Sequence, residues 1–212
     1  MKGLLLKDFM ISKRSLTSFG IIIILLFTAS LAMRSNLSIL NGGLFSFISI
    51  YFTIFLSFNL FTYDETCHWN IFALSLPVSK RVLVRGRYVF LLLVLISAIG
   101  LSILFYIAFG SVFSLEILLQ IAASITVSLI LISFLLPFIY HFGTQTTRIL
   151  LMVVFASFFL LAFLLQNLSI APPTLTDQSV ILLCYAAFGA SILCFFISYL
   201  VSCKIVENKD FN

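Results

Sequence analysis

The residues of this 212-residue chain that could catalyse a reaction or hold a metal are few and scattered. The adjacent carboxylates of Asp64 and Glu65 would point about 100° apart on a helix and would not converge on a substrate. The cysteines include no C-x-x-C pair and the two histidines lie on separate polar segments; these residues are Cys67, Cys184, Cys194, Cys203, His68 and His141. This spacing predicts neither a metal site nor a disulfide framework. The sequence therefore argues against an enzyme.

The sequence also lacks the motifs of a nucleotide site. It contains no G-x-x-x-x-G-K phosphate-binding loop and no glycine-rich dinucleotide turn. We therefore predict that the chain does not hydrolyse a nucleotide by itself and holds no cofactor. Any ATP, with its Mg, must be bound by another subunit.

The composition requires a membrane, because 62% of the residues are hydrophobic and 9% are charged, against roughly 25% charged in an ordinary soluble domain. Apolar runs of about 20 residues are long enough to cross the hydrocarbon core of a bilayer. They occur near 17–33, 39–62, 88–110, 115–138, 148–167 and 179–202. The strands of a membrane β-barrel would instead alternate apolar and polar residues. We predict an all-α membrane protein with six transmembrane helices in a single domain, residues 1–212.

The basic residues are distributed unevenly over the two ends of these spans. With six spans, both termini share one side of the membrane with the polar segments 63–87 and 139–147. Eleven of the twelve Lys and Arg residues fall on that side, and only Arg34 falls on the other. The positive-inside rule therefore predicts that the N- and C-termini are cytoplasmic. Because an anionic inner leaflet accounts for the net charge of +5, no nucleic-acid partner is predicted.

The longest polar insert runs from Tyr63 to Tyr88. Thr62 and Glu65 have the spacing of a capping box, in which each side chain accepts a hydrogen bond from the other residue's backbone N–H. We therefore predict that a short helix begins here. Residues at the spacing of one apolar helix face follow; they are Trp69, Phe72, Ala73 and Leu76.

Two further signals divide the insert. Pro77 should end the short helix, because the residue before a proline disfavours the helical conformation. Ser79 should then cap a new helix whose first turns are basic. The insert is therefore predicted to be a membrane-surface helix, a break, and a basic entry into the third span.

Residues 1–16 mix apolar and charged side chains ahead of the first span. Two interpretations remain open: an amphipathic helix lying at the inner membrane interface, and a simple charged lead-in to the span. A cleaved signal peptide is a third, since basic residues precede an apolar run that ends in Ser30-Leu31-Ala32. We reject it because its removal would leave five spans and destroy the charge asymmetry.

Local signals predict three further boundaries. Pro137 should end or kink span four. A polar inner turn over Tyr140–Thr147 should follow it. The charged segment after Lys204 is expected to fray.

No ionisable residue lies near the middle of a predicted span, where a proton- or sodium-coupled carrier would need one. Energy for transport would then enter from outside the bilayer, most directly through the insert. Its short helix could lay Trp69 into a groove on a soluble partner, with Asp64 and Glu65 available to basic groups across the interface. The same face could instead rest on lipid headgroups, where tryptophan is also favoured. The residues alone leave both interpretations open.

Several short motifs in the sequence resemble a known family. They are Tyr63-Asp64-Glu65, Trp69, Ser75-Leu76-Pro77-Val78-Ser79-Lys80-Arg81, Val84-x-x-Arg87-Tyr88 and the opening Leu4-Leu5-Leu6-Lys7-Asp8-Phe9. Together they resemble the signature of bacterial ABC type-2 permeases, and six spans match that family along the whole chain. The sequence departs at Arg87, where Lys is expected, and at Asn70, where an acidic residue is common. These departures bear on partner specificity.

The resemblance implies a permease subunit of the bacterial plasma membrane. Such a subunit pairs with a second copy or a sister permease and with two cytoplasmic ABC ATPase subunits, which hold the ATP and Mg. Residues 1–16 would form an elbow helix, and 63–80 a coupling helix between spans two and three. Pro77 to Arg81 would hold the angle between the coupling helix and span three. The residues expected to contact the ATPase are Tyr63, Asp64, Glu65, His68, Trp69, Phe72, Leu76, Pro77 and Arg81.

The cargo is predicted from composition and resemblance together. Twenty-five Phe residues and uncharged span centres suit a hydrophobic or amphipathic cargo, although Phe facing lipid also explains that composition. Small permeases resembling this one are often linked with export of, or immunity to, membrane-active peptides, so we expect export of such a cargo. The alternative is a non-transporting membrane immunity or scaffold protein.

Overall fold

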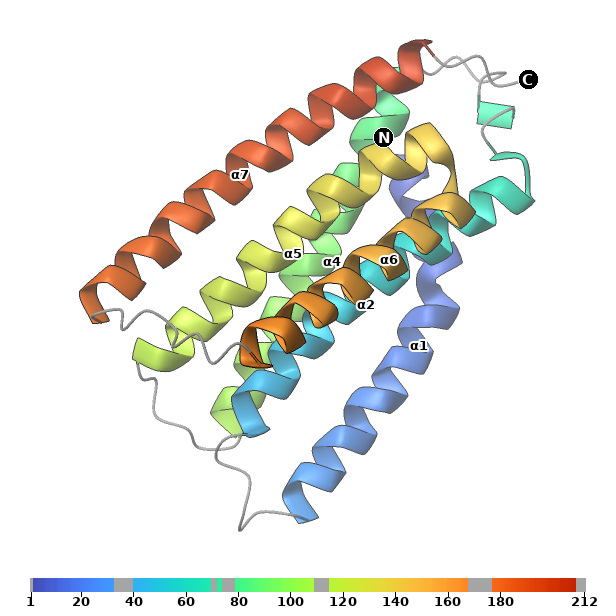
Figure 1. Ribbon diagram of the computed structural model, residues 1–212. Coiled ribbons are helices and arrows are strands. Elements are labelled where there is room, and N and C mark those ends of the chain that lie inside the picture. The colour runs from blue at the N-terminus through green and yellow to red at the C-terminus, as the bar shows by residue number, and fades with distance from the viewer. Residues whose placement is uncertain are drawn as a thin grey trace.

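The computed structural model describes residues 2–32, 40–69, 72–73, 79–108, 115–167 and 177–208. Within them the chain forms six long α-helices and no β-strand (Figure 1). These helices are α1 (Lys2–Ala32), α2 (Leu40–Thr66), α4 (Lys80–Ala108), α5 (Leu115–Phe142), α6 (Thr144–Asn167) and α7 (Asp177–Asn208). The prediction of an all-α protein is confirmed.

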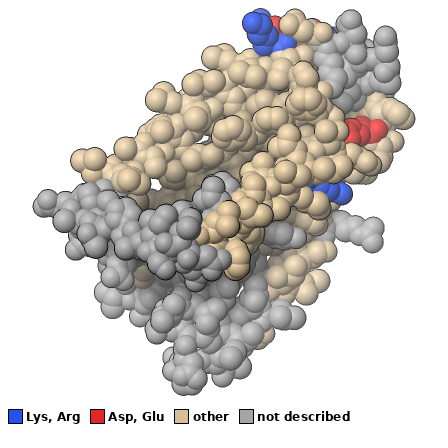
Figure 2. All heavy atoms as spheres, viewed as in Figure 1, with Lys and Arg blue, Asp and Glu red and all other residues tan. Residues whose placement is uncertain are grey.

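The helices run side by side in one bundle, with α1 and α7 at opposite edges (Figure 1). The α5 helix packs most extensively against α7, and α2 packs against both α4 and α5. The start of α1, the end of α2, the start of α4 and the end of α7 share one end of the bundle. We call it the charged end, because Lys7, Asp64, Arg81 and Glu207 form ion pairs there. In Figure 2 the charged atoms visible on one face gather at this end.

Three helices of the described chain are long and apolar enough to cross a membrane, over Lys80–Leu104, Ile117–Phe142 and Ile181–Asn208. They lie in α4, α5 and α7 and coincide with predicted spans three, four and six. Predicted spans one, two and five fall within α1, α2 and α6. For these three helices, crossing the membrane stays a prediction, as does the side of the membrane that the charged end faces.

Two predicted helix boundaries near the insert are wrong. The α1 helix runs without interruption from Lys2 to Ala32, so residues 1–16 do not form an elbow helix separate from the first span. The α2 helix continues through Thr62 to Thr66, so no helix begins at the predicted capping box. The Oγ1 atom of Thr62 is buried with no hydrogen-bond partner in the described chain. In contrast, α4 begins at Lys80, directly after Ser79, as predicted.

The α5 helix passes through Pro137 and continues to Phe142, so of the predicted end or kink at this residue, the end does not occur. A proline removes the N–H that would bond the carbonyl four residues earlier, which here belongs to Ser133. The hydroxyl of Ser198 in α7 donates to that carbonyl at 2.7 Å. Because a neighbouring helix satisfies the freed group, the proline is tolerated.

The inner turn is shorter than predicted and the C-terminal segment is better ordered. A single residue, Gly143, joins α5 to α6 with φ of +85°, and its N–H donates to the Ile139 carbonyl at 2.9 Å. Past Lys204, α7 continues to Asn208 with Val206 buried in the core. The expectation of fraying is wrong for residues 205–208, where Glu207 pairs with Arg81 at the start of α4. Residues 209–212 lie outside the described residues.

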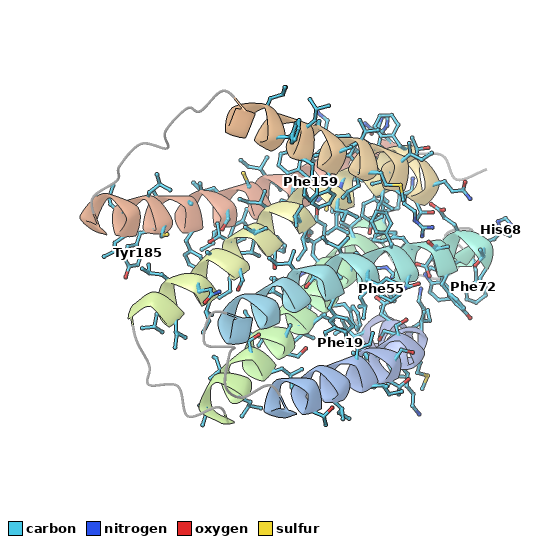
Figure 3. The ribbon with its side chains drawn as sticks, turned by 60° about the horizontal axis from the view of Figure 1, so that its bottom comes forward. Phe19, Phe55, His68, Phe72, Phe159 and Tyr185 are labelled. Atoms are coloured by element: carbon cyan, nitrogen blue, oxygen red, sulfur yellow. The ribbon has the colours of Figure 1, made fainter. Side chains whose placement is uncertain are left out.

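The core lies where α2, α4 and α5 meet, around the fully buried Leu56, Leu91 and Leu136. The outer faces of α6 and α7 expose large apolar side chains instead. Phe159 and Tyr185, both labelled in Figure 3, are examples and are 77% and 73% exposed. Apolar side chains on the outside of a bundle suit contact with lipid or with another membrane-embedded subunit.

Candidate functional site

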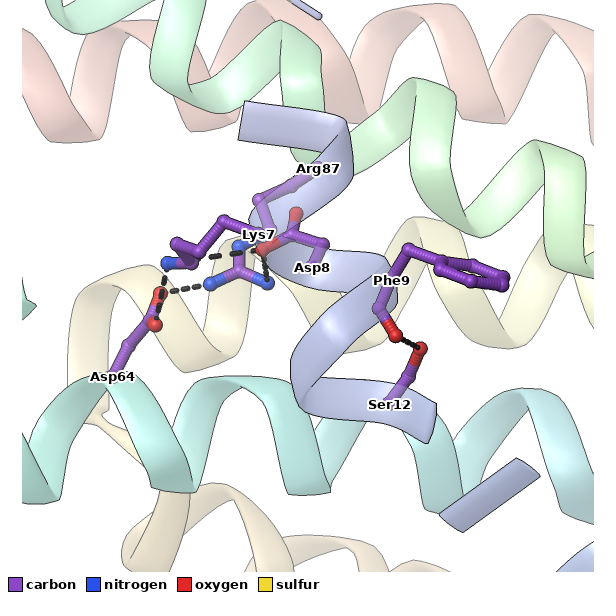
Figure 4. A network of polar contacts seen from close by, with 6 residues as sticks. All are labelled: Lys7, Asp8, Phe9, Ser12, Asp64 and Arg87. Atoms are coloured by element: carbon purple, nitrogen blue, oxygen red, sulfur yellow. Dashed lines mark hydrogen bonds and ion pairs between the residues drawn. The ribbon is translucent and has the colours of Figure 1, made fainter. Parts of the chain in front are cut away.

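Four charged side chains from three helices meet at the charged end (Figure 4). Lys7 Nζ of α1 donates to Asp64 Oδ1 of α2 at 2.8 Å. Arg87 of α4 places its NH1 2.8 Å from Asp8 Oδ1 and donates through NH2 to Asp64 Oδ2. Lys7 Nζ also lies 3.7 Å from Asp8 Oδ1. We call Lys7, Asp8, Asp64 and Arg87 the ion cluster.

The ion cluster is buried and electrically balanced. Asp8, Asp64 and Arg87 are 3%, 4% and 6% exposed. Charges removed from water to this extent are tolerated only when paired, and here two cations face two carboxylates. The planar guanidinium of Arg87 can reach both carboxylates at once, which a single ammonium does less well. The cluster therefore joins α1, α2 and α4 at one point.

Burial shifts the pKa values of Lys7 and Asp8, the two members of the ion cluster that belong to α1. Burial, and after it the positive charge of Arg87, lowers the pKa of Lys7 to about 7. Burial also raises the pKa of Asp8 above its ordinary value, against the opposing effect of Arg87. The short contact between Lys7 and Asp64 favours the charged lysine, so burial and pairing oppose each other at Lys7.

Aromatic rings enclose the ion cluster. The Lys7 ammonium lies 3.8 Å from the centroid of the Trp69 ring, and the Arg87 guanidinium lies 5.1 Å from that of Phe61. A cation held over a ring face in this way is attracted by the electrons of the ring. A cavity of about 30 Å³ remains beside the cluster, with Tyr140 among its lining residues.

Glu65 binds α6, whereas its neighbour Asp64 binds α1 and α4. The backbone N–H of Thr144, the first residue of α6, donates to Glu65 Oε1 at 2.9 Å, and the Thr144 hydroxyl donates to Oε2. A carboxylate at a helix N-terminus satisfies free N–H groups and the helix dipole. Because Asp64 and Glu65 point in different directions, the last turn of α2 is attached to α1, α4 and α6 together.

The chain makes a sharp turn directly beyond this attachment. The α2 helix ends at Thr66, and the Cys67 N–H donates to the Tyr63 carbonyl at 3.0 Å. His68 has φ of +49°, a left-handed conformation that is uncommon for a residue other than glycine. The Phe72 N–H then donates to the His68 carbonyl at 3.4 Å, so a new helical turn begins.

The structure separates the predicted ATPase contacts into outer and inner residues. Tyr63, His68, Phe72 and Arg81 are exposed, and Figure 3 shows His68 and Phe72 at the tip of the molecule. Trp69 is half-buried against Lys7, whereas Asp64 is buried and Glu65 is bound to α6. Leu76 and Pro77, like Asn70, lie outside the described residues.

Lys7, Asp8 and Arg87 were not predicted from the sequence to be members of one site. The available signal was that opposite charges lie next to long apolar runs in three segments that the predicted topology brings to one side. Ionisable groups at the edge of a membrane span are expected to seek partners. Among the described residues, no group of three or more His, Cys, Asp or Glu side chains could hold a metal ion.

The apolar helices and the charged end define a class, namely the multi-pass membrane proteins of the all-α type. The sequence assigns it further: the chain belongs to the family described as ABC-2 family transporter protein, which it matches over residues 3–207. It is thus the membrane-spanning permease component of an ABC transporter, and family membership implies an ATPase partner. No curated protein or solved structure is significantly similar to the chain.

Proposed function

We propose that this permease exports a hydrophobic or amphipathic cargo, and that a cytoplasmic ATPase subunit drives it by docking at the charged end. One observation carries the proposal: Asp64 and Glu65 attach the last turn of α2 to three other helices. A displacement of the segment that follows Thr66 would therefore reach α1, α4 and α6 together. Such an arrangement suits a part that receives mechanical work from another subunit.

The docking surface in this proposal consists of the outer residues of the insert. Tyr63, His68, Phe72 and Arg81 are exposed at the charged end, and Phe72 is 56% exposed. An exposed aromatic residue beside basic groups is typical of a protein-binding hot spot. The half-buried Trp69 completes the docking surface, and Asp64 and Glu65 support it from beneath. Leu76 and Pro77, the other contacts that the sequence predicts, lie outside the described residues.

The proposed cargo is supported by an apolar groove between α5 and α6. The groove has a volume of about 790 Å³, and its lining includes Phe134, Phe138, Val154 and Phe155, with Thr147 as its polar member. Such a surface suits acyl chains or the apolar face of a peptide. Membrane-active peptides fit this chemistry and are the cargo we propose. A second copy of the permease, or a sister permease, would form the other wall of the transport path.

Co-purification tests the docking directly. The permease is co-expressed with a candidate ABC ATPase subunit from the same organism, and the recovered ATPase is measured after detergent extraction. We expect Phe72→Ala and Arg81→Ala to reduce recovery at least fivefold. Phe159→Ala is the matched control, because Phe159 is an exposed aromatic residue of α6. Equal recovery with Phe72→Ala and Phe159→Ala would exclude this docking surface.

The side of the membrane is tested with Cys67, which is exposed in the turn after α2. A variant that keeps Cys67 and replaces the other three cysteines with alanine is treated with a membrane-impermeant maleimide. We expect labelling in inside-out vesicles and none in intact cells. Labelling of intact cells would place the charged end outside and exclude an ATPase contact there.

A non-transporting immunity or scaffold protein is the second candidate. The exposed apolar side chains of α6 and α7 favour it as well, because they could bind a membrane-embedded peptide without moving it. Resistance of cells to a membrane-active peptide separates the two candidates. Transport predicts that resistance is lost when the ATPase gene is deleted, whereas the scaffold predicts that it is kept.

A further inference from the structure

The ammonium of Lys7 contacts two different parts of the chain. It donates to Asp64 in the last turn of α2 at 2.8 Å, and it lies 3.8 Å from the ring centroid of Trp69, which is beyond that helix. Its side chain is 18% exposed, so it is largely held in place. The Lys7 ammonium of α1 thus bridges Asp64, at the end of α2, and Trp69, in the segment that follows α2.

Trp69 in turn lies between the ion cluster and the outer surface. Its ring centroid is 5.4 Å from that of Phe72, whose side chain is exposed. Inside, the Trp69 ring lies over Lys7. A partner that touches Phe72 would therefore be one aromatic contact away from the ion cluster.

The backbone between α2 and Trp69 needs an external restraint. His68 adopts φ of +49°, and a non-glycine residue in this region persists only where its surroundings hold it. Trp69 follows His68 directly, so the Lys7–Trp69 contact acts on the residue next to the strained one. No other contact of the Trp69 ring with a cation is present in the described chain.

We propose that Lys7 is a positioning residue for energy coupling, which holds Trp69 against the ion cluster and so fixes the resting position of the docking surface. The N-terminal part of α1 then belongs to the coupling apparatus, although it carries no docking contact itself. This inference rests on the proposed function, because it concerns how the docked ATPase finds the insert in place. Arg87 does not share this role, because its guanidinium lies over the ring of Phe61, whereas Lys7 lies over that of Trp69.

Tryptophan fluorescence tests the contact itself. Trp69 is the only tryptophan of the chain, so the emission of the purified permease reports on this residue alone. We expect Lys7→Met to raise the acrylamide quenching constant at least twofold and to shift the emission to longer wavelength. Lys7→Arg, which keeps a cation able to sit over the ring, should preserve both values.

Lys80→Met is the control, because Lys80 donates to the Glu207 carbonyl and is not placed over the Trp69 ring. Unchanged quenching in Lys7→Met would overturn the inference.

The ratio of cargo transported to ATP hydrolysed tests the coupling role in proteoliposomes that contain the permease and its ATPase. We expect Lys7→Met to lower this ratio at least fivefold while the ATPase still co-purifies, and Lys7→Arg to restore it. A raised quenching constant with an unchanged ratio would overturn the positioning role.

If Lys7→Met does not accumulate, Trp69→Leu, which keeps every charge of the ion cluster, must lower the ratio in its place. If wild-type permease retains no ATPase, the proposed function fails, whereas the fluorescence result still decides the Lys7–Trp69 contact.

Discussion

The hydroxyl of Ser198 in α7 donates a 2.7 Å hydrogen bond to the backbone carbonyl of Ser133 in α5. That carbonyl lacks its helical donor because Pro137 has no N–H. Ser198 has a single proton and uses it here, so Tyr88 must donate to Ser198 at 2.7 Å, and Ser202 must donate to Tyr88 at 2.8 Å. The hydrogen bonds therefore run in one direction, from Ser202 of α7 to Tyr88 of α4, back to Ser198 of α7 and on to Ser133 of α5.

We predict that Ser198→Ala destabilises the bundle. The substitution leaves the Ser133 carbonyl without a donor inside an apolar environment. In membrane proteins such a hydrogen bond is worth roughly 1 kcal/mol. Thermal unfolding of the purified permease in detergent, followed by circular dichroism, should show a lower midpoint.

Two controls separate this bond from general packing. In a Pro137→Ala background the N–H of residue 137 returns to the Ser133 carbonyl, so Ser198→Ala should cost less. Ser157→Ala should have no effect, because Ser157 is exposed and donates only to the Val154 carbonyl of its own helix. An equal loss of stability from Ser198→Ala with and without Pro137 would show that the proline is not the reason for the bond.

The connection between α5 and α6 gives a second prediction. Gly143 has φ of +85°, and a Cβ atom there would lie 3.4 Å from Glu65 Oε1. Gly143→Ala should therefore destabilise the protein by about 1 kcal/mol. Gly100→Ala in α4 is the matched control, because nothing lies within 4 Å of a Cβ at that position. It should be neutral or slightly stabilising, since alanine is the better helix former. Equal midpoints for the two variants would contradict this role of Gly143.

The helices themselves could be predicted from the sequence, because long apolar runs leave the backbone no alternative to helical hydrogen bonding in a membrane. The role of Glu65 could not be predicted. The capping motif wrongly indicated that its carboxylate accepts from the backbone N–H of Thr62, at a helix start there. The helix that it caps begins 79 residues later, at Thr144, and no local pattern can specify such a pairing.

For a related reason the sequence could place the charges of the ion cluster on one side of the membrane but could not show that they meet. Each of its charges stands beside other polar residues in the sequence, as in Tyr63-Asp64-Glu65 and Arg85-Gly86-Arg87, and such charges are ordinarily solvated. Only the packing of α1, α2 and α4 buries Asp8, Asp64 and Arg87 together. The continuation of α1 through residue 16 supplies Lys7 and Asp8, whereas a separate elbow helix on the membrane surface would have left them in water.

A third prediction concerns the charge balance of this cluster. Arg87→Met leaves two buried carboxylates facing only Lys7, and breaking a buried pair in this way costs roughly 3–5 kcal/mol. We expect a strongly reduced amount of folded permease, measured by size-exclusion chromatography in detergent. Adding Asp8→Asn restores one cation facing one carboxylate, so the double variant should recover much of the loss. A double variant no better than Arg87→Met would mean that shape, and not charge, decides stability at this site.

A fourth prediction concerns the protonation of Lys7. It tests whether burial, which lowers the pKa of Lys7, or the contact with Asp64, which favours the charged form, has the larger effect. Burial lowers the pKa of Lys7 from 10.5 to about 7. Between these values the unfolded chain keeps a proton that the folded chain has released, so stability rises with pH across this window. The slope attributable to Lys7 is at most about 1.4 kcal/mol per pH unit. The midpoint of the wild-type protein should therefore rise relative to that of Lys7→Met as the pH goes from 7 to 9.

A constant difference between the two midpoints would instead mean that Asp64, at 2.8 Å, keeps Lys7 charged throughout. In that case the contact with Trp69 would not weaken at alkaline pH, and the quenching constant of Trp69 would be independent of pH over the same range.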